Sequence, residues 1–582
     1  MNYLRLLAEK FPTIESVTNE LVNLRAIMHL PKGTEYYFSD LHGEHEAFIH
    51  LLRSGSGVIR EKIDALFRSS MMEEDRSALA ALVYYPTTQM ARARKTEQNY
   101  ADWCTITINH LVIVACEVSA KYTRSKVRQT IDPRYAGLIE ELMNTDGTDA
   151  DKRVYYREMI ETVVQVGCAE GLIKALCHLI QQMTVDQLHI IGDIFDRGPR
   201  ADRILDELMK HHDVDIQWGN HDVAWIGAMC GNPVCLMSVL RIAISYNGFD
   251  CLEDGYGINL RPLSMFAATT YANDPCERFM PHVLDENEFD PVDPALAAKM
   301  HKAVTVMMFK LEGQLIKRHP EYEMEGRLLL DKMNLEKGTI QIGGKEYQLT
   351  DTNFPTVDPK DPYALTEEEQ NLLDGFLASF RHSERLRTHL DFIMSHGAMY
   401  KIANNKLLYH GCILVEEDGS LTEVELGGSR HKGRALLDYL EMHVRRAYHS
   451  EAPDSVDLIW YLWCGARSPL FGKDRMTSFE RYFIDDKALQ KEHMNPYYKH
   501  YDQPEFCEAI LREFGLDPAC SHIVNGHVPV KHGDSPIKAG GRLFVIDGGI
   551  SKAYRSKTGI AGYTLISSSH EIQLAEHRPF HR

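Results

Sequence analysis

Five short segments of the sequence carry side chains of the types that bind metal ions and act on phosphate esters. They contain aspartate, histidine, asparagine and arginine, and each follows an apolar run typical of a β-strand. The segments are 40–43 (DLHG), 192–198 (GDIFDRG), 219–222 (GNHD), His410 in LYHGC and His527 in NGHVP. Because ligands bind at the carboxyl ends of strands in open α/β sheets, we expect these segments to meet at one site.

The residue types in these segments suit a pair of divalent metal ions. Carboxylate, imidazole and amide ligands without thiolate favour manganese, iron, zinc or magnesium over a structural zinc cage. Hydrolysis of a phosphate ester at neutral pH requires a hydroxide nucleophile and neutralisation of the phosphoryl oxygens, and two metal ions about 3.5–4 Å apart provide both. One carboxylate must bridge the ions, and Asp193 lies between the other two motifs in the chain. The remaining candidate ligands are Asp40 and His42 for one ion, and Asn220, His410 and His527 for the other.

Three further side chains are candidates for acid catalysis and phosphate binding. The leaving alkoxide needs a proton, which a nearby imidazolium can supply. We expect His221 to be this general acid because it follows the candidate ligand Asn220, and we expect Asp196 to orient it and hold it charged. Arg197 is a candidate phosphate clamp, because a guanidinium binds phosphate oxygens bidentately.

Each motif also has an ordinary structural interpretation. An isolated Asp-x-His is usually a surface turn, and a single His410 or His527 is more often a core or loop histidine. The GDxxDRG motif can be a helix N-cap beside a turn, because Asp196 and Gly198 suit both. The order DxH, GDxxDRG and GNHD, each after a strand and followed by two strand-end histidines, favours a two-metal phosphoesterase.

The flanking patterns predict the elements that position these residues. Strands are expected over 35–40, at the start of 185–198 and over 214–218, and helices follow at 45–55 and 201–211. The later segments KLLYHGCILV, SHIVNGHVPV and RLFVIDGG read as strands, and IAGYTLISSS and EIQLAEH read as sheet edges. An amphipathic helix is expected over 13–30, closed by Pro31-Lys32-Gly33. The fold class predicted is α/β, and α+β in part.

The chain is too long, at 582 residues, for one compact core. We therefore expect a catalytic core made of 1–60, 184–260 and 391–582, interrupted by two insertions. The insertion at 61–183 is rich in helical patterns, which include runs over 108–131 and 161–183. The insertion at 261–390 has helical patterns near 294–318 and 366–390, a capping box of Thr366 and Glu369, and a hairpin turning at Gly343-Gly344.

Composition excludes several classes of partner. The 64 Lys and Arg against 83 Asp and Glu give a net charge of −19, which argues against nucleic acid and against an anionic membrane surface. A phosphorylated substrate is still allowed, because bound metal ions reverse the sign of the field locally. The twelve scattered cysteines suggest reduced, mostly buried thiols. The N-terminus lacks the pattern of a signal peptide, so a cytoplasmic location is expected.

The order of the motifs resembles the signature of the calcineurin-like phosphoesterases, especially the phosphoprotein-phosphatase branch. SDLHGE resembles GDxHG with Ser39 in place of the first glycine, and GDIFDRG resembles GDxVDRG. GNHD resembles GNHE with Asp222 in place of glutamate, and LYHGC resembles a strand ending in HGG with Cys412 in place of the second glycine. None of these differences from the family motifs falls on a candidate ligand. The resemblance implies a calcineurin-like metallophosphatase β-sandwich flanked by helices, here with large, mostly helical insertions.

A weaker match in the same family suggests a second phosphate-binding arginine. The segment 457–479 (DLIWYLWCGARSPLFGKDRMTSF) resembles the family segment that runs from DLLW to such an arginine. The counterpart by this resemblance is Arg475, and Arg467 is a competitor. Either side chain would otherwise form a surface salt bridge.

The two insertions and several longer segments resemble a narrower group, the class III fructose-1,6-bisphosphatases. The segments are YYFSDLHGEHEAF, IIGDIFDRGPR and IDGGISKAYRSKTGIAGYTLI, and the resemblance runs the length of the chain. It implies hydrolysis of fructose 1,6-bisphosphate to fructose 6-phosphate and phosphate in gluconeogenesis. It also implies a preference for Mn²⁺, although these ligands accept other divalent first-row metals.

A sugar bisphosphate has a second phosphate that needs a cationic partner. Two basic clusters are candidates: Arg430, Lys432 and Arg434 in GGSRHKGR, and Lys552, Arg555 and Lys557 in SKAYRSKTG. A helix is predicted directly after the first cluster, and a helix N-terminus favours phosphate. Basic residues in loops are otherwise usually just solvated.

Two rival functions are consistent with the same motifs. A protein Ser/Thr phosphatase or a dinucleotide-polyphosphate hydrolase would have the same metal centre, so only a substrate panel separates them. A non-catalytic scaffold of the same fold, binding protein partners, could lose ligands or the general acid without losing its fold. This chain keeps all six candidate ligands and His221, which argues against a scaffold. The helical insertions would suit a subunit interface in a homo-oligomer.

Overall fold

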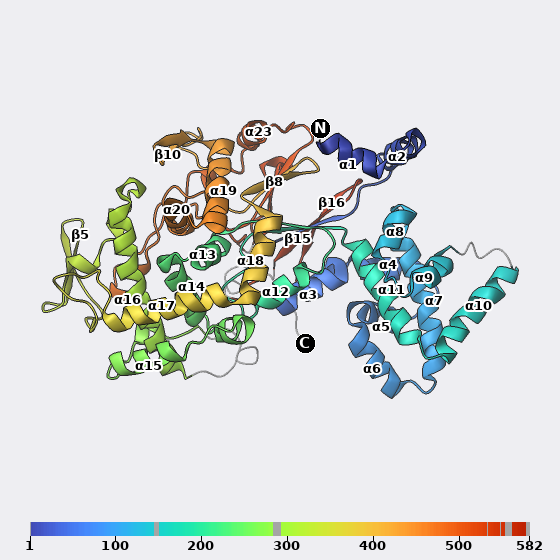
Figure 1. Cartoon of the computed structure of the whole chain (residues 1–582), viewed down its shortest axis with the longest axis horizontal. Helices are drawn as coiled ribbons and strands as arrows, with labels where there is room; N and C mark the ends of the chain where they lie inside the picture. Colours follow the sequence, from blue (N-terminus) through green and yellow to red (C-terminus); the bar gives the residue numbers. More distant parts are fainter. Residues whose placement is uncertain are drawn as a thin grey trace. The chain divides into compact units, whose positions relative to one another are not determined.

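The computed structural model describes residues 2–144, 150–282, 293–531, 533–547, 549–552 and 562–577, and it is a mixed α/β structure (Figure 1). The α/β class predicted from the sequence is confirmed. The chain separates into two compact units. The first comprises 1–36, 49–188 and 566–575, and the second comprises 37–48, 189–565 and 576–582.

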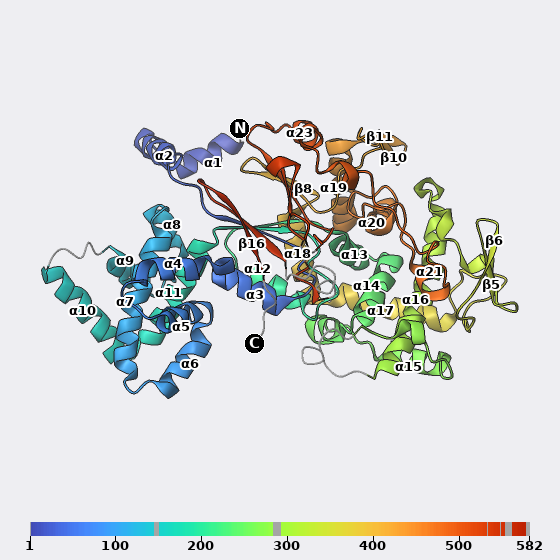
Figure 2. The ribbon, with the colours of Figure 1, turned by 180° about the vertical axis from the view of Figure 1, so that it is seen from behind.

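The first unit is mainly helical (Figure 2). Its helices are α1 (Asn2–Lys10), α2 (Ile14–Ile27), α4 (Val58–Phe67), α5 (Glu73–Tyr84), α6 (Pro86–Thr96), α7 (Tyr100–Ser119), α8 (Arg124–Thr130), α9 (Ala136–Met143), α10 (Ala150–Gln165) and α11 (Ala169–Thr184). Their core is one apolar cluster centred on the packing of α7 against α11. Helix α7 is the one unbroken helix of the described chain that is long and apolar enough to cross a membrane, and its residues Ile108, Leu111 and Val114 are buried in this cluster.

Three expectations for the first unit were wrong in detail. The helical run predicted over 108–131 is interrupted between α7, which ends at Ser119, and α8, which begins at Arg124. The helical run predicted over 161–183 is broken into α10 and α11 at Gly167, whose φ of +81° is left-handed and ends a helix readily. The predicted helix over 13–30 ends earlier, at Ile27, and it buries none of its residues. Thr13 caps it, because its side chain accepts a hydrogen bond from the Ser16 backbone N–H.

A six-stranded sheet carries the first three motifs. Its strand order is β16 (Ile572–Glu576), β15 (Tyr563–Ser567), β1 (Glu35–Ser39), β2 (Gln187–Ile191), β3 (Val214–Gln217) and β7 (Gly397–Ala398). The three predicted strands before the motifs are confirmed as β1, β2 and β3, and they are neighbours. The prediction that both C-terminal strands are sheet edges holds for β16 but is wrong for β15, which pairs on both sides.

A five-stranded sheet carries the two later histidines. Its order is β13 (Ile537–Lys538), β14 (Leu543–Val545), β12 (His522–Asn525), β9 (Lys406–Tyr409) and β8 (Tyr400–Ala403). Strand β12 runs parallel to both β9 and β14, in the register Val524↔Leu408 and Asn525↔Val545. The residues that follow these three strands therefore leave the sheet at the same edge.

Helices form much of the rest of the second unit (Figure 1). They are α12 (Ala201–Leu208), α13 (Asn220–Met229), α14 (Pro233–Ser245), α15 (Arg261–Thr270), α16 (Pro294–Arg318), α17 (Glu367–His382), α18 (Glu384–His396), α19 (Gly433–Ser450), α20 (Pro453–Cys464), α21 (Ser478–Phe483), α22 (Tyr497–His500) and α23 (Pro504–Glu513). Helix α3 (His45–Ser54) follows the first motif. Helix α16 has the predicted bounds, the capping box of Thr366 and Glu369 is present, and the predicted hairpin is β5 (Thr339–Ile342) with β6 (Lys345–Gln348). The helical pattern predicted near 366–390 forms two helices, because α17 ends at His382 and Ser383 caps α18.

Buried ion pairs hold the loops around α16. The ammonium of Lys310 lies 2.7 Å from a carboxylate oxygen of Glu369, and that carboxylate also closes the capping box of α17. The fully buried Lys302 contacts Asp274 at 2.5 Å and Asp351 at 2.6 Å. Removing either partner of such a pair would leave an uncompensated buried charge, so these contacts fix the loop positions.

Candidate metal centre

The motif loops are tied to one another by backbone hydrogen bonds. The N–H of Asp40 donates to the carbonyl of Gly192 at 3.0 Å, and the N–H of His42 donates to the carbonyl of Asp193 at 2.8 Å. The N–H of Gly526 donates to the carbonyl of His410 at 3.1 Å, which joins the ends of β9 and β12. These bonds tie the loop after β1 to the loop after β2, and the end of β9 to the end of β12.

Asp193 lies at the middle of this cluster. It belongs to two groups of potential ligands, one with His42 and His221 and one with His410 and His527, and within each group the ligand atoms lie within 4.8 Å of one another. One carboxylate oxygen of Asp193 is 3.4 Å from Nε2 of His410 and 3.8 Å from Nε2 of His42. A carboxylate shared by two groups has the position that a bridging ligand requires.

Backbone carbonyls fix the orientation of the histidine rings. Nδ1 of His42 donates to the carbonyl of Phe195 at 3.0 Å, and Nδ1 of His410 donates to that of Ile191 at 3.1 Å. Nε2 of His527 donates to the carbonyl of Phe471 at 2.9 Å. Because a carbonyl only accepts, these nitrogens carry protons. The other ring nitrogen is then left with a lone pair in His42 and His527, the arrangement seen in metal-binding histidines.

Two oxygen atoms of the cluster also fit a cation. Oδ1 of Asn220 is buried and has no hydrogen-bond partner, which is costly unless a positive ion occupies the space that it faces. Oδ2 of Asp40 accepts hydrogen bonds from the N–H of His527 at 3.0 Å and from the Ser39 hydroxyl. Its Oδ1 lies 3.9 Å from Nε2 of His42. The donor set of nitrogen and oxygen atoms therefore fits a pair of divalent ions.

Burial and neighbouring charges set the protonation of the cluster. Burial lowers the pKa of His42 well below its usual value and that of His527 to about 3, so both rings are neutral and able to ligate. Burial would also raise the pKa of Asp193, but the positive charge of His410 holds it well below the usual range. The carboxylate of Asp193 in turn offsets the effect of burial on His410, whose pKa is raised to about 10.

The backbone of the site is unusually strained. Left-handed φ angles between +44° and +72° occur at the non-glycine residues Asp40, His42, Asp193, Asp196, Arg197 and His527. Such conformations cost about 1–3 kcal/mol each and persist only where the surroundings enforce them. Their concentration in the motif loops indicates that the loops are shaped by the side chains that they must present.

The Asp222 side chain holds the loops after β2 and β3 together through hydrogen bonds to their backbone. Its carboxylate accepts from the N–H groups of Asp193, Ile194 and Gly219 at 2.9, 2.9 and 3.0 Å. Burial, followed by the negative charge of Asp193, raises its pKa to about 6. Gly219 must be glycine, because a Cβ there would lie 2.1 Å from a carboxylate oxygen of Asp193.

His221 lies in the same cluster but has different partners from the other histidines. Its Nδ1 is 2.7 Å from Asp196, and the second oxygen of that carboxylate accepts from the Trp225 indole N–H at 2.9 Å. Its Nε2 faces an Arg197 nitrogen at 3.1 Å, and another Arg197 nitrogen is 2.7 Å from Nε2 of His42. The predicted acid, its orienting carboxylate and the predicted phosphate clamp are therefore adjacent.

The other predicted arginines have different surroundings. The guanidinium of Arg475 donates to the backbone carbonyls of Leu489 at 3.1 Å and Lys491 at 3.0 Å. Arg467 lies 3.4 Å from a carboxylate oxygen of Glu323, at the exposed surface. Both side chains therefore have protein partners, and neither hydrogen-bonds to a candidate ligand within the described residues.

The basic cluster of GGSRHKGR lies on the β10–β11 hairpin (Val424–Leu426 and Ser429–His431) and the start of α19. Arg430 is paired with Glu425 at 3.0 Å and Glu423 at 3.2 Å, and Arg434 donates to the Tyr400 hydroxyl at 3.0 Å. Lys432 is exposed at the N-cap of α19. In the part of the chain that the structure describes, none of the three hydrogen-bonds to a candidate metal ligand.

The second basic cluster is only partly described. The backbone N–H of Lys552 donates to a carboxylate oxygen of Glu44 at 2.8 Å. Glu44 directly follows the DLHG motif and is buried. The first residue of this cluster is thus tied to the first motif loop, whereas Arg555 and Lys557 lie outside the described residues.

Sequence reasoning missed two charged residues close to the site. Asp547 follows β14 at the position level with His527, since Asn525 pairs with Val545, and it is buried. Burial and then the negative charge of Asp40 raise its pKa well above the usual value. Asp547 follows the predicted strand RLFVIDGG, so its position at a strand end, the signal that identifies His410 and His527, could also have found it.

Lys473 is the second missed residue. It lies two positions after Phe471, whose carbonyl holds the ring of His527, and its positive charge contributes to the lowered pKa of that histidine, after burial and His410. Its ammonium is 2.9 Å from Glu492, and its side chain is 31% exposed. No sequence signal identifies it, because its proximity depends on how the 465–477 loop folds.

Comparisons with known proteins cover the whole chain. A family model described as Firmicute fructose-1,6-bisphosphatase matches residues 2–582. The chain is 50% identical to the fructose-1,6-bisphosphatase class 3 of Clostridium acetobutylicum, over all of this chain and 88% of that protein. Proteins of the same name from Clostridium botulinum (strain Langeland) and Clostridium tetani are 50% and 49% identical, each over 100% of this chain and 88% of the relative. No solved structure matches the chain.

Proposed function

Since this chain belongs to the class 3 fructose-1,6-bisphosphatase family, we infer that it hydrolyses fructose 1,6-bisphosphate to fructose 6-phosphate and inorganic phosphate, a step of gluconeogenesis. The whole-length similarity carries this inference. The gathering of the motif side chains around Asp193 supports it, because such a cluster can hold two metal ions that activate water and stabilise the attacking and leaving oxygens.

We propose that the cluster holds two divalent ions, with Mn²⁺ preferred. Asp193 would bridge them, Asp40 and His42 would complete one site, and Asn220, His410 and His527 would complete the other. The partnerless oxygen of Asn220 and the neutral rings of His42 and His527 support this assignment. When bound, such ions supply a nucleophile at neutral pH and neutralise phosphoryl oxygens.

The protein's own groups would then orient the substrate and move a proton. Arg197 would hold two phosphoryl oxygens with its planar fork, which already points between His42 and His221. His221 would donate the proton on Nε2 to the departing sugar oxygen, so that the phosphorus–oxygen bond breaks without forming a free alkoxide. Asp196 would keep the ring oriented through Nδ1, and Trp225 would in turn orient Asp196.

The phosphate that is not hydrolysed needs its own cation, and Lys473 is the candidate we favour. Like Arg475 and Arg430 it has a protein partner, Glu492 at 2.9 Å, but its charge is close enough to lower the pKa of the candidate ligand His527. Lys473→Met should lower kcat/KM for fructose 1,6-bisphosphate by roughly 10–100-fold, the loss of one charge-assisted hydrogen bond. Activity on p-nitrophenyl phosphate should change less than twofold, and the exposed Lys499→Met is the matched control.

The architecture supports two further proposals. The two sheets whose strand ends meet at Asp193 would be the β-sandwich of a calcineurin-like fold, with 61–183 and 261–390 as insertions into it. The enzyme would be cytoplasmic, which is consistent with its acidic composition and with cysteines that are all free and mostly buried in the described chain.

A substrate panel tests the proposed function. Phosphate release would be measured for fructose 1,6-bisphosphate, a phosphopeptide, diadenosine tetraphosphate and p-nitrophenyl phosphate. The sugar bisphosphate should have the highest kcat/KM by at least tenfold. A preference for the phosphopeptide or the dinucleotide would replace this function with a protein phosphatase or a dinucleotide-polyphosphate hydrolase.

A further inference from the structure

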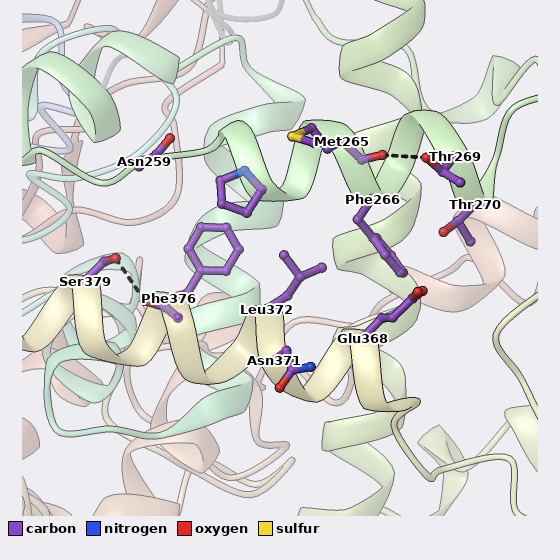
Figure 3. A pocket seen from close by; sticks show the side chains of 12 residues that line it. Asn259, Met265, Phe266, Thr269, Thr270, Glu368, Asn371, Leu372, Phe376 and Ser379 are labelled. Atoms are coloured by element: carbon purple, nitrogen blue, oxygen red, sulfur yellow. Dashed lines mark hydrogen bonds between the residues drawn. The ribbon is translucent and has the colours of Figure 1, made fainter.

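A cavity of about 560 Å³ lies between helices α15 and α17 of the second unit (Figure 3). Its apolar lining includes Met265 and Phe266 from α15, and Leu372 and Phe376 from α17. Figure 3 shows the side chains of the two helices pointing toward one another across this space. The volume falls within the range of about 300–1,000 Å³ that is usual for small-molecule sites.

The polar groups of the cavity limit what it can bind. Glu368 is its one charged lining residue; it is exposed, and it has no ion pair or side-chain hydrogen bond among the described residues. The hydroxyls of Thr269 and Ser379 are already used, because they donate to carbonyls of their own helices at 3.1 and 2.9 Å. No basic residue lines the described cavity, so nothing there would neutralise a phosphate or a carboxylate.

We propose that this cavity binds a small amphipathic cation, with its ammonium on Glu368 and its apolar body between Phe266, Leu372 and Phe376. Figure 3 shows Glu368 and the Phe266 ring directed toward one another, so that a cation at Glu368 would also face an aromatic ring. The ion pair and the ring both favour a positive charge, and the apolar walls favour a hydrocarbon body.

Aromatic and hydrogen-bond contacts connect the cavity with the proposed general acid. Phe380 lies one helical turn after Phe376 on α17, and its ring centroid is 5.9 Å from that of Trp225 on α13. The Trp225 indole donates to Asp196 at 2.9 Å, and Asp196 contacts His221 at 2.7 Å. A ligand that moved α17 would therefore shift the group that orients His221, and this kinetic part of the proposal rests on the proposed function.

Binding is tested with three matched probes: 4-phenylbutylamine, 4-phenylbutanol and 4-phenylbutyrate. Isothermal titration at neutral pH on the full chain should show saturable binding of the amine. The alcohol should bind at least tenfold more weakly, and the carboxylate should not bind. Equal binding of the amine and the carboxylate, or no binding of the amine, would overturn the proposal.

Two pairs of variants locate the site. Glu368→Gln should weaken the amine at least tenfold, whereas Glu367→Gln, in the same helical turn but outside the lining, should not. A Cβ added at Gly375 would meet nothing within 4 Å, so Gly375→Leu should fill the cavity and abolish binding, and Gly375→Ala should spare it. The proposal fails if both members of a pair behave alike. It also fails if the chain proves to be a dimer that Gly375→Leu dissociates, because the cavity would then be a subunit interface.

The proposed effect of the ligand on catalysis is tested by measuring kcat for p-nitrophenyl phosphate. A saturating amine should change kcat at least twofold in the wild-type chain and not in Gly375→Leu. An unchanged kcat with the amine demonstrably bound would contradict the connection to His221. Activity on fructose 1,6-bisphosphate without any probe tests the proposed function, so the failure of one is distinguishable from the failure of the other.

Discussion

At the scale of single residues, His221 differs from the other histidines of the cluster in what its ring nitrogens face. His42 and His410 each direct Nδ1 at a backbone carbonyl and leave Nε2 near Asp193. His221 instead directs Nδ1 at the Asp196 carboxylate. A carboxylate partner favours the protonated form of an imidazole, which suits a ring that must donate a proton.

This difference predicts the behaviour of His221→Asn. Metal content should stay that of the wild type, because the proposed ligands are unchanged. Turnover of fructose 1,6-bisphosphate should fall by roughly 10²–10⁴-fold, the usual contribution of general acid catalysis. Metal analysis and steady-state kinetics check both parts, with the exposed His500→Asn as the control. Loss of metal together with activity would make His221 a ligand, which its grouping with His42 and Asp193 also allows.

A second prediction at this scale concerns a histidine outside the cluster. His301 on α16 is buried, with Nδ1 donating to the Phe279 carbonyl at 2.9 Å, and burial lowers its pKa to about 3. An unfolded chain takes up this proton near pH 6.5, so the unfolded state binds more protons between pH 6.5 and pH 3 and stability falls as the pH falls through that window. The loss should reach about 3 kcal/mol near pH 4.5.

The measurement is urea unfolding at several pH values. His301→Gln should be less stable than the wild type at neutral pH, because its buried partners lose a well-placed donor. Its stability should nevertheless change less between pH 6.5 and pH 4.5. If the two chains lose stability in parallel over this window, His301 does not contribute to the acid sensitivity.

At the scale of elements, the site is made where strand ends pass close to one another. The β3–α13 turn passes so near the loop after β2 that Gly219 has no room for a side chain. Gly219→Ala should displace Asp193, weaken metal binding at least tenfold and lower activity in proportion. Gly137→Ala in α9, where a Cβ meets nothing within 4 Å, should leave metal binding unchanged and stabilise the helix by about 0.5–1 kcal/mol. Normal metal binding by Gly219→Ala would show that the loops have more freedom than these distances imply.

Among the secondary-structure elements, some could be predicted from the sequence and others could not. Strands β1, β2, β3, β9 and β12 were predictable because each is an apolar run ended by a polar motif. The break at Gly167 was not, because apolar spacing continues on both sides and only the left-handed φ ends the helix. The position of β15 between β16 and β1 could not be predicted either. A short apolar strand has the same sequence pattern at the edge of a sheet and in its interior.

The residues of the candidate site also differ in whether the sequence could predict them. The grouping of the proposed ligands could be predicted, because few residue types can ligate a metal ion and the topology fixes which strand ends meet. The roles of cations were not, because a guanidinium can equally bind phosphate or a carbonyl. Arg475 matches a family motif but bonds to the carbonyl of Lys491, whereas Lys473 matches none and lies near His527.

At the scale of the whole molecule, the proposed ligands all belong to the second unit, whereas the first unit is a helical cluster with its own core. Metal ions should therefore stabilise the second unit selectively. A ligand at 100 times its dissociation constant stabilises the folded state by about 2.7 kcal/mol. Of the five tryptophans, Trp103 alone lies in the first unit, so the fluorescence of Trp103→Phe reports the second unit alone.

Thermal unfolding of Trp103→Phe should shift upward when Mn²⁺ is added to metal-stripped protein. A chain that keeps Trp103 but has the other four tryptophans replaced by phenylalanine, if it folds, should show a smaller shift or none. Equal shifts from the two reporters would mean that the units unfold together.

The most direct test of the proposed centre is a titration of metal-stripped protein with Mn²⁺, with bound metal and phosphate release from fructose 1,6-bisphosphate measured on the same samples. Activity should be absent without metal and should rise to its maximum as the bound metal approaches two ions per chain. Full activity in the stripped protein, or a maximum reached with no metal bound, would contradict a two-metal centre bridged by Asp193.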